Sequence, residues 1–518
     1  CQKEDDADSY EEKLYSVETF EKTAVYAPIS EYLNSSGDAL FADTSNNSDD
    51  SHMKALYTGK SMMTLMLVEV ILQAQMQINS YHYRHRKQRE DSPRFLKSIV
   101  LTTPPAMSDL EKEVFRSCVY QALGIVWKAR GFDKSPVREF SFITKAQEMF
   151  PKPPEVKLDF SETMAGQLVY FYNETQRVFN GNALDFISHI RRDDADGRYN
   201  EYAPLEFANK RADYKSARIA TIDIGGGTTD LVITDYSVPY KVYADKENKD
   251  AGFTNVSNQQ GIVQIREVLK DGNKIAGDDL VHDIICDEII PKLKDRYELK
   301  NIIGSAKEAG NALSKQKRVQ CVEQIFTRIA YRILSRIEQL TKAPIEITSI
   351  VTNGSISDFL KNTDNCPVLD AVFDKTDNGF EVDSSVKEYV KNGLGVNDFF
   401  DTKLEFDIYR INRKLFHNSS NSLSNTLDYL NTIVNAYRCD VLLLTGRASK
   451  LPGIRRLIES KSYLSAKRIV SMHSYDCSSW YPTFSLSDGK IGDPKTSVVV
   501  GAAIGDIKTS NVNNLINF

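Results

Sequence analysis

The residues most able to do chemistry lie in residues 218–236, whose sequence is RIATIDIGGGTTDLVITDY. Two β-rich stretches flank a turn that contains three glycines and two threonines. Glycine tolerates positive φ and lets backbone N–H groups approach phosphate oxygens, and threonine hydroxyls supply further donors. The pattern predicts a strand–turn–strand unit whose turn binds phosphate through Gly225, Gly226, Gly227, Thr228 and Thr229.

One carboxylate enters this turn and another leaves it. Asp223 precedes the glycines, and Asp230 follows the threonines. Carboxylate oxygens are hard ligands that suit Mg²⁺, an ion that usually keeps several of its waters. We therefore expect Asp223 and Asp230 to hold a magnesium ion through water. A glycine-rich hairpin turn can also form without any ligand, but three glycines exceed what a two-residue turn demands.

A strand and a helix precede this segment in the chain. Residues 98–103 (SIVLTT) predict a buried strand, which two prolines stop. Ser108, with Glu111 three residues later, predicts a capping box and a helix that ends at about Gly124. A strand, a proline turn and a helix in this order indicate an α/β unit.

The part of the chain before that strand divides into a loop and a helix. Residues 34–52 are rich in Ser, Asn and Asp, which favour loops. From Ser61 to about Arg89, apolar residues recur at helical spacing, and we expect the Met-rich face to pack in the core. The basic run at 84–89 falls where this helix ends, as the helix dipole favours. We find no stretch of the ~18 to 20 uncharged apolar residues that a membrane span requires.

Two segments near the other end of the chain add a second set of elements. Residues 441–453 (VLLLTGRASKLPG) predict an apolar strand, a glycine turn and a helix that begins at a proline. Residues 494–505 (PKTSVVVGAAIG) predict a helix whose small residues let a second helix approach closely.

The segment DIGGGTTD at 223–230 resembles the second phosphate-binding motif of the superfamily that joins actin, DnaK-type chaperones and sugar kinases. The helix at 494–505 resembles the one that closes the second lobe in that superfamily. Each motif alone is a weak signal, but their order along the chain is specific. Four further segments resemble superfamily motifs in the expected order: 99–105, 161–166 (SETMAG), 277–280 (GDDL) and 441–453.

Within the superfamily, three stretches resemble the bacterial virulence factor SrfB family. They are residues 61–80, 101–107 (LTTPPAM) and 493–505 (DPKTSVVVGAAIG). The resemblance implies a first phosphate motif, similar to D-x-G-T, upstream of Cys1, because residues 1 to 218 contain none.

The resemblance implies a role for each matched residue. The glycines and threonines of the turn would hold the β and γ phosphates of ATP, with Asp223 and Asp230 on the hydrated Mg²⁺. Glu162 would orient the water that attacks the γ-phosphate, although glutamate is also favoured at an exposed helix start. The remaining nucleotide contacts would come from Gly277, Asp278, Asn311, Ser314, Gly446, Arg447 and Ser449.

The sequence also departs from the superfamily pattern at several of these positions. Thr163 stands where proline is usual, Ala276 replaces a glycine, and Arg447 replaces a common second glycine. In residues 306–314 (AKEAGNALS), the expected adenine-packing helix, Gly310 and Asn311 stand where the chaperones have Lys and Arg. Base recognition is therefore expected to differ.

The resemblance implies an α/β architecture, the two-lobed actin-like ATPase (ribonuclease H-like) fold, with the first lobe only partly present. Each lobe would hold a mixed sheet flanked by helices. The acidic insertion at 362–401 resembles no part of that fold. We expect a flexible or linking segment at 1–52, the C-terminal part of the first lobe at 53–215, the second lobe at 216–505 with its outer subdomain at about 277–401, and a tail at 506–518.

Composition limits the partners. The 518 residues are 41% apolar and 26% charged, enough to bury a sizeable core. The formal charge of −6 argues against binding to a nucleic-acid backbone, which needs surplus Lys and Arg. The seven cysteines include no C-x-x-C pair, so neither a zinc site nor a disulfide framework is indicated, and a reducing cytoplasm fits best.

The chain begins at Cys1 and runs directly into an acidic stretch. It is interpreted either as a processed lipoprotein anchored through an acylated Cys1 or as a piece of a longer chain. The second interpretation explains the missing first phosphate motif, and ATP is scarce outside the cytoplasm. We therefore expect a cytoplasmic protein, and weak Mg-ATP binding by this chain alone.

Three functional classes stay open at this point. The first is a nucleotide-switched ATPase that changes lobe angle and so regulates a protein partner. The second is a non-catalytic or filament-forming scaffold in which nucleotide is structural. The third is a phosphotransferase similar to sugar kinases, for which no carboxylate base is identified.

Overall fold

The computed structural model shows a mixed α/β protein that divides into two compact units, Cys1–Ser161 and Glu162–Phe518. The predicted loop at 34–52, Cys1 and Asn311 lie outside the residues that the structure describes. Each unit is considered by itself. The described residues are 59–86, 93–105, 107–130, 153–192, 212–244, 250, 252–255, 263–303, 312–340, 351–360, 381–416, 422–477, 480–510 and 516–517.

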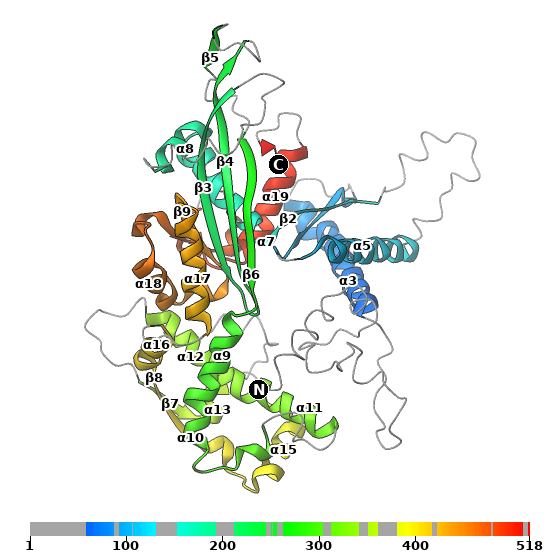
Figure 1. Ribbon diagram of the computed structural model, residues 1–518. Helices are drawn as coiled ribbons and strands as arrows, with labels where there is room; N and C mark the ends of the chain where they lie inside the picture. Colours follow the sequence, from blue (N-terminus) through cyan, green and yellow to red (C-terminus); the bar gives the residue numbers. More distant parts are fainter. Residues whose placement is uncertain are drawn as a thin grey trace, which may run out of the picture. The chain divides into compact units, whose positions relative to one another are not determined.

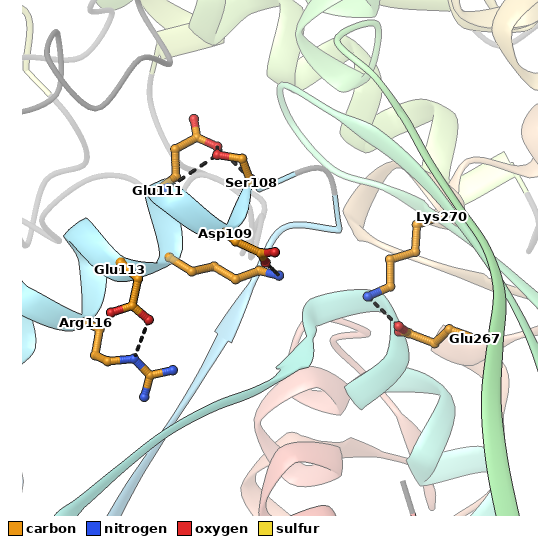
Figure 2. A network of polar contacts seen from close by, with 8 residues as sticks. Ser108, Asp109, Glu111, Glu113, Arg116, Glu267 and Lys270 are labelled. Atoms are coloured by element: carbon orange, nitrogen blue, oxygen red, sulfur yellow. Dashed lines mark hydrogen bonds and ion pairs between the residues drawn. The ribbon is translucent and has the colours of Figure 1, made fainter.

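The first unit contains the predicted strand and its capped helix. Strand β1 (Ser98–Thr103) pairs in parallel with β2 (Glu155–Ser161), and helix α5 (Asp109–Ala129) follows β1. The capping box is confirmed: the backbone N–H of Glu111 donates to Ser108 Oγ at 3.3 Å, and that of Ser108 donates to the Glu111 carboxylate at 2.7 Å (Figure 2). The helix runs five residues past the predicted end because Gly124 lies on its exposed side and does not stop it.

The predicted helix over 61–89 is present as two helices, α3 (Gly59–Asn79) and α4 (Tyr81–Arg86), which meet at Ser80. Leu67 and Ile71 of α3 are buried in a core shared with α5 and β2, so one face of the helix does pack in a core. Met66 and Met76, however, are more than half exposed. The segment Lys60–Asn79 is long and apolar enough to cross a membrane. Core helices of soluble proteins can have the same length and composition. The expectation of no membrane span stays a prediction.

The second unit is built on a seven-stranded mixed sheet. Strands β3 (Ala212–Ile224), β4 (Thr229–Tyr243) and β6 (Val263–Asn273) form an antiparallel meander, seen as the long central ribbons of Figure 1. Strand β9 (Val441–Thr445) pairs in parallel with β3, and β10 (Ile469–Ser471) pairs in parallel with β9. Two short strands, β5 (Phe253–Asn255) and β13 (Ile516–Asn517), pair with β4 and β6.

A buried ion pair joins β3 to β4 within the meander, and its arginine also contacts the residue before β9. The guanidinium of Arg218 on β3 donates to both carboxylate oxygens of Asp235 on β4, at 2.7 and 2.8 Å. The backbone N–H of Arg218 donates to Asp440, which precedes β9 and is fully buried. These partners satisfy a charge that would otherwise be costly to bury.

Helices α7 (Glu162–Asn173), α8 (Ala183–Ile190) and α19 (Thr496–Ser510) belong to the same unit. The side-chain N–H of Gln167 on α7 donates to the carbonyl of Ile219 at 3.1 Å. The hydroxyl of Tyr236 donates to Gln167 Oε1 at 2.7 Å. Helices α7 and α8, which the sequence assigns to the first lobe, both pack on β3 and β4. The predicted lobe boundaries themselves stay predictions.

Small residues let α19 approach α7, as predicted. A Cβ built on Gly501 of α19 would lie 1.6 Å from the carbonyl oxygen of Ala165 on α7. A Cβ on Gly166 would lie 3.2 Å from Ser497 Oγ. Gly501 is therefore required by a contact between two backbones rather than by its own φ.

The expected outer subdomain is mainly helical where the structure describes it. Its strand β7 (Val351–Ser355) pairs with β8 (Lys403–Asp407) of the same region. The described helices of this region are α9 (Gly277–Ile284), α10 (Ile290–Leu293), α11 (Ala312–Cys321), α12 (Thr327–Gln339), α13 (Ile356–Leu360) and α15 (Ser384–Leu394), with π-helical turns at Ile285–Ile289 and Val322–Phe326 and 3₁₀ turns at Leu299–Asn301 and Phe399–Asp401.

Helices α16 (Ile408–Phe416), α17 (Ser422–Ala436) and α18 (Pro452–Lys461) complete the second unit. The predicted order of strand, glycine turn and proline-started helix at 441–453 is confirmed by β9, Gly446 and α18. Gly453 lies against Phe416 of α16, where an added Cβ would come within 2.1 Å of the ring. Figure 1 shows α17 and α18 beside the sheet.

Replacing Gly501 with alanine should lower the free energy of unfolding by about 1–3 kcal/mol, because the new Cβ must push α19 off α7. Gly124→Ala is the matched control, since this exposed glycine in the middle of α5 has nothing within 4 Å of an added Cβ. It should be neutral or raise stability by up to about 1 kcal/mol. Urea denaturation of both variants tests the contact, and equal effects would contradict it.

Candidate functional site

The glycine turn lies at the end of the β3–β4 hairpin and packs on the start of α9. The backbone N–H of Gly277 donates to the carbonyl of Gly225 at 3.1 Å, and that of Asp278 donates to Gly226 at 2.8 Å. A Cβ on Gly277 would lie 3.0 Å from the carbonyl oxygen of Gly225. The sheet thus brings the predicted turn and the predicted 277–278 segment together, although some 50 residues separate them in sequence.

The two predicted carboxylates face each other across the hairpin. Asp223 and Asp230 are direct register partners on β3 and β4, and each is only 7% exposed. Asp230 accepts a hydrogen bond from Thr228 Oγ1 at 3.0 Å. In contrast, Oδ1 of Asp223 is buried and receives no hydrogen bond from the described residues. A buried oxygen without a partner is costly, so a ligand at this position would relieve the site.

The surroundings of Asp223 and Asp230 disfavour a negative charge on both carboxylates at the same time. The pKa of Asp223 is raised to about 6, mainly by burial; the charge of Lys495 opposes this rise, and the carboxylates of Asp230 and Glu162 contribute to it. Burial also raises the pKa of Asp230, with Glu162 adding to the effect and the Thr228 hydrogen bond opposing it. Glu162, the first residue of α7, therefore lies near both aspartates, although the sequence places it some 60 residues earlier.

Gly446 closes the site from β9. Its φ of 81° lies in the region that favours glycine, and an added Cβ would lie 2.3 Å from the Ile224 carbonyl oxygen and 2.4 Å from Asp223 Oδ1. Ser449 does not point into open space, because its hydroxyl donates to the Gly446 carbonyl at 2.7 Å and the residue is fully buried. Ser449 thus shapes the Gly446 turn.

A cavity of about 220 Å³ adjoins the glycine turn. Three predicted segments line it: Gly225–Gly226, Gly277–Asp278 and Arg447. The other wall is helix α12, which sequence reasoning did not connect to the site. The α12 residues in the lining are Tyr331, Leu334, Ser335 and Glu338, and the remaining apolar lining comes from Leu280, Val281, Ala448 and Leu451.

Among the described residues, three charged side chains line the cavity: Asp278, Glu338 and Arg447. Arg447 and Lys450 both pair with Glu338 of α12, at 3.3 and 3.8 Å. The pKa of His473 is lowered to about 4, mainly by burial and also by the charges of Lys450, Arg455 and Arg447. Burial and the neighbouring Asp279 raise the pKa of Asp278. The cavity lining therefore carries both acidic and basic groups.

Some predicted contacts take a different form in the structure. The hydroxyl of Thr229 donates to the Ile275 carbonyl at 2.7 Å, and that of Thr228 donates to Asp230. Only backbone N–H groups of the turn are then left for a ligand. Ser314 falls in α11, but its side chain lies outside what the structure describes, as does the whole of Asn311.

The acidic pair offers few direct ligands to a divalent cation. No group of three His, Cys, Asp or Glu side chains within the described residues is arranged to hold a metal ion directly. Two opposed carboxylates, one with an unpartnered oxygen, do suit a hydrated Mg²⁺ that needs only one or two protein carboxylates. The residues present therefore fit an ion held through water.

The fold and the site together define a mixed α/β protein with a cavity at the glycine turn of a hairpin whose strands carry two buried, opposed aspartates. The chain belongs to the virulence factor SrfB family, whose model matches residues 8–518. The resemblance noted from three short stretches is thereby confirmed over nearly the whole chain. No curated protein matches the sequence significantly.

Replacing Asp223 with asparagine should change how stability depends on pH. Because burial raises the carboxyl's pKa to about 6, its proton-linked stability is complete below the unfolded value near 4 and is lost as pH rises through 6. Without metal, Asp223→Asn should therefore gain about 3 kcal/mol over wild type between pH 4 and pH 7.5. Urea denaturation with a chelator measures this difference, and parallel pH profiles for the two proteins would contradict it.

Proposed function

We propose that this protein binds ATP with Mg²⁺ at the glycine turn, and that hydrolysis switches its contact with a protein partner. The observation that carries the proposal is the convergence of Gly225–Gly226, Gly277–Asp278 and Arg447 on one cavity beside two buried, opposed aspartates. A mixed sheet flanked by helices also agrees with the actin-like fold that the motifs imply. The family's virulence association gives the switch its expected biological setting.

The turn suits the phosphate groups of the nucleotide. Gly226 and Gly227 are exposed at the tip of the turn. Backbone N–H groups bind phosphate oxygens when successive ones point the same way. The start of α9 packs against the turn, and a helix N-terminus favours negative charge nearby.

Mg²⁺, when bound, would offset the charge of the phosphates and polarise the terminal one. Asp223 and Asp230 would hold its waters, since both lie at the strand ends beside the turn. Their burial disfavours two free negative charges, and this favours a cation there.

Glu162 is suited to position the attacking water. It begins α7, and its charge acts on both aspartates, so its carboxylate lies near them. A carboxylate within reach of a water can accept its proton as the oxygen attacks phosphorus. The buried Gln167 anchors α7 on β3, which holds Glu162 in place.

The cavity suits the nucleoside. Tyr331, Leu334 and Leu451 offer apolar contact to a base, and Glu338 and Arg447 are polar groups at its rim. In this proposal, helix α12 packs against the base, the role that was expected from the sequence for residues 306–314. A scaffold with structural nucleotide is the alternative, and the absence of turnover would favour it.

Mg-ATP should stabilise the protein by about 2.7 kcal/mol at a hundredfold excess over its Kd. Asp223→Asn should lose most of this stabilisation, because the hydrated ion loses a charged ligand. The matched control is Asp401→Asn, since Asp401 is exposed and lies outside the cavity lining. Thermal unfolding with and without Mg-ATP tests the proposal. No shift in wild type, or an equal shift in Asp223→Asn, would overturn it.

Glu162→Gln should keep Mg-ATP binding but lower hydrolysis by about 10² to 10⁴, the usual contribution of general acid–base help. If Glu162 only starts a helix, the change should cost a few tenths of a kcal/mol and leave turnover alone. Phosphate release and ATP affinity are measured on both proteins. Equal turnover refutes the catalytic role, and undetectable turnover in both favours the scaffold.

A further inference from the structure

One cation near the two aspartates has no assigned role in the proposed function. Lys495 immediately precedes α19, and its side chain is exposed. Its charge acts on both Asp223 and Asp230, in each case opposing the effect of Glu162. Its position is set by the packing of α19 and not by its own side-chain contacts.

Two helix contacts bring Lys495 to the site. Ser497, two residues after Lys495, lies against Gly166 of α7, and Gly501 lies against the Ala165 carbonyl. The amide of Gln167, the next residue of α7, donates to Thr221 Oγ1 on β3 at 3.0 Å. Asp223 follows Thr221 on the same strand by two residues. This series of backbone and side-chain contacts thus places the start of α19 next to the start of α7 and the end of β3.

Lys495 lies near the acidic pair without being bound to it. The ammonium group forms no ion pair with a carboxylate of the described residues, whereas the backbone is engaged: its N–H donates to Asp493 at 3.0 Å and its carbonyl accepts from Val498 at 3.3 Å. The buried Asp223 Oδ1 meanwhile has no partner within the described part of the chain. A lysine carries a compact charge on a flexible stem, so it can reach different partners from one backbone position.

We propose that Lys495 is the internal counter-cation of the Asp223–Asp230 pair, and that it competes with a divalent cation until a phosphate group binds its ammonium. The inference rests on the proposed function for the identity of that phosphate. Without nucleotide, the ammonium offsets part of the acidic charge and weakens binding of Mg²⁺ alone. With nucleotide, the terminal phosphate accepts from Lys495, and the carboxylates become fully available to the hydrated ion.

This arrangement makes metal binding depend on nucleotide. A site with three carboxylates and no cation would bind Mg²⁺ whether or not ATP was present. With Lys495 beside it, the same site binds the metal and the nucleotide together. Lys495 is then a positioning residue for the metal as well as a phosphate contact.

The experiment compares wild type with Lys495→Met, which keeps the length of the side chain and removes its charge. Mg²⁺ alone, titrated by thermal shift, should bind Lys495→Met roughly tenfold more tightly, because one like charge has been removed from a partly screened site. Mg-ATP should bind the same variant roughly tenfold more weakly, because a charge-assisted hydrogen bond to phosphate is lost. Opposite changes in one variant cannot result from general misfolding.

Lys467→Met is the matched control and should change neither affinity. Lys467 is exposed and precedes β10, whose parallel pairing with β9 places it at the opposite strand ends from Thr445 and Asp223. Unchanged Mg²⁺ affinity in Lys495→Met overturns the counter-cation role. If wild type binds no Mg-ATP, the proposed function fails, whereas tighter Mg²⁺ binding by Lys495→Met still supports the competition.

Discussion

The burial of two facing carboxylates at the end of one hairpin is the constraint on which the candidate site depends. Asp223 and Asp230 are held opposite each other by the register of β3 and β4, which the buried Arg218–Asp235 pair reinforces five residues away on each strand. The two aspartates cannot move apart unless the hydrogen bonds between β3 and β4 break. The negative charge of the two carboxylates must therefore be offset by protons, by a bound metal ion or by Lys495. The stability of the sheet then depends on protonation and on ligand binding.

Close backbone approach builds the rest of the site. Gly446 lets the end of β9 come against Ile224 and Asp223, Gly277 lets α9 come against the glycine turn, and Gly501 lets α19 come against α7. Each contact brings a different part of the chain to the same end of the sheet. Side chains larger than hydrogen at these positions would separate the elements that carry Asp223, Asp278 and Lys495. The glycines therefore act mainly through packing, and only Gly446 among these three also requires positive φ.

Local patterns predicted much of the fold. The strand at 98–103, the Ser108–Glu111 capping box and the hairpin with its glycine turn all depend on residues close together in sequence. The motif order also led to the segments around Gly277 and Arg447, which the structure brings to one cavity. Thr229 shows the limit of this reasoning, because its hydroxyl was expected to face a ligand but instead donates to the Ile275 carbonyl.

The sequence by itself determined which residues could bind phosphate and metal, because residue type and local spacing decide the turn, the strands and the helix starts. Only the tertiary structure brought Glu162 near Asp223, made α12 a wall of the cavity and placed Lys495 near the acidic pair. These pairs are tens to hundreds of residues apart, and they meet through the crossing of α7 with α19 and the packing of α12 near α9. A single sequence carries no local signal for such contacts, since the same helices could pack in other ways with equal propensity.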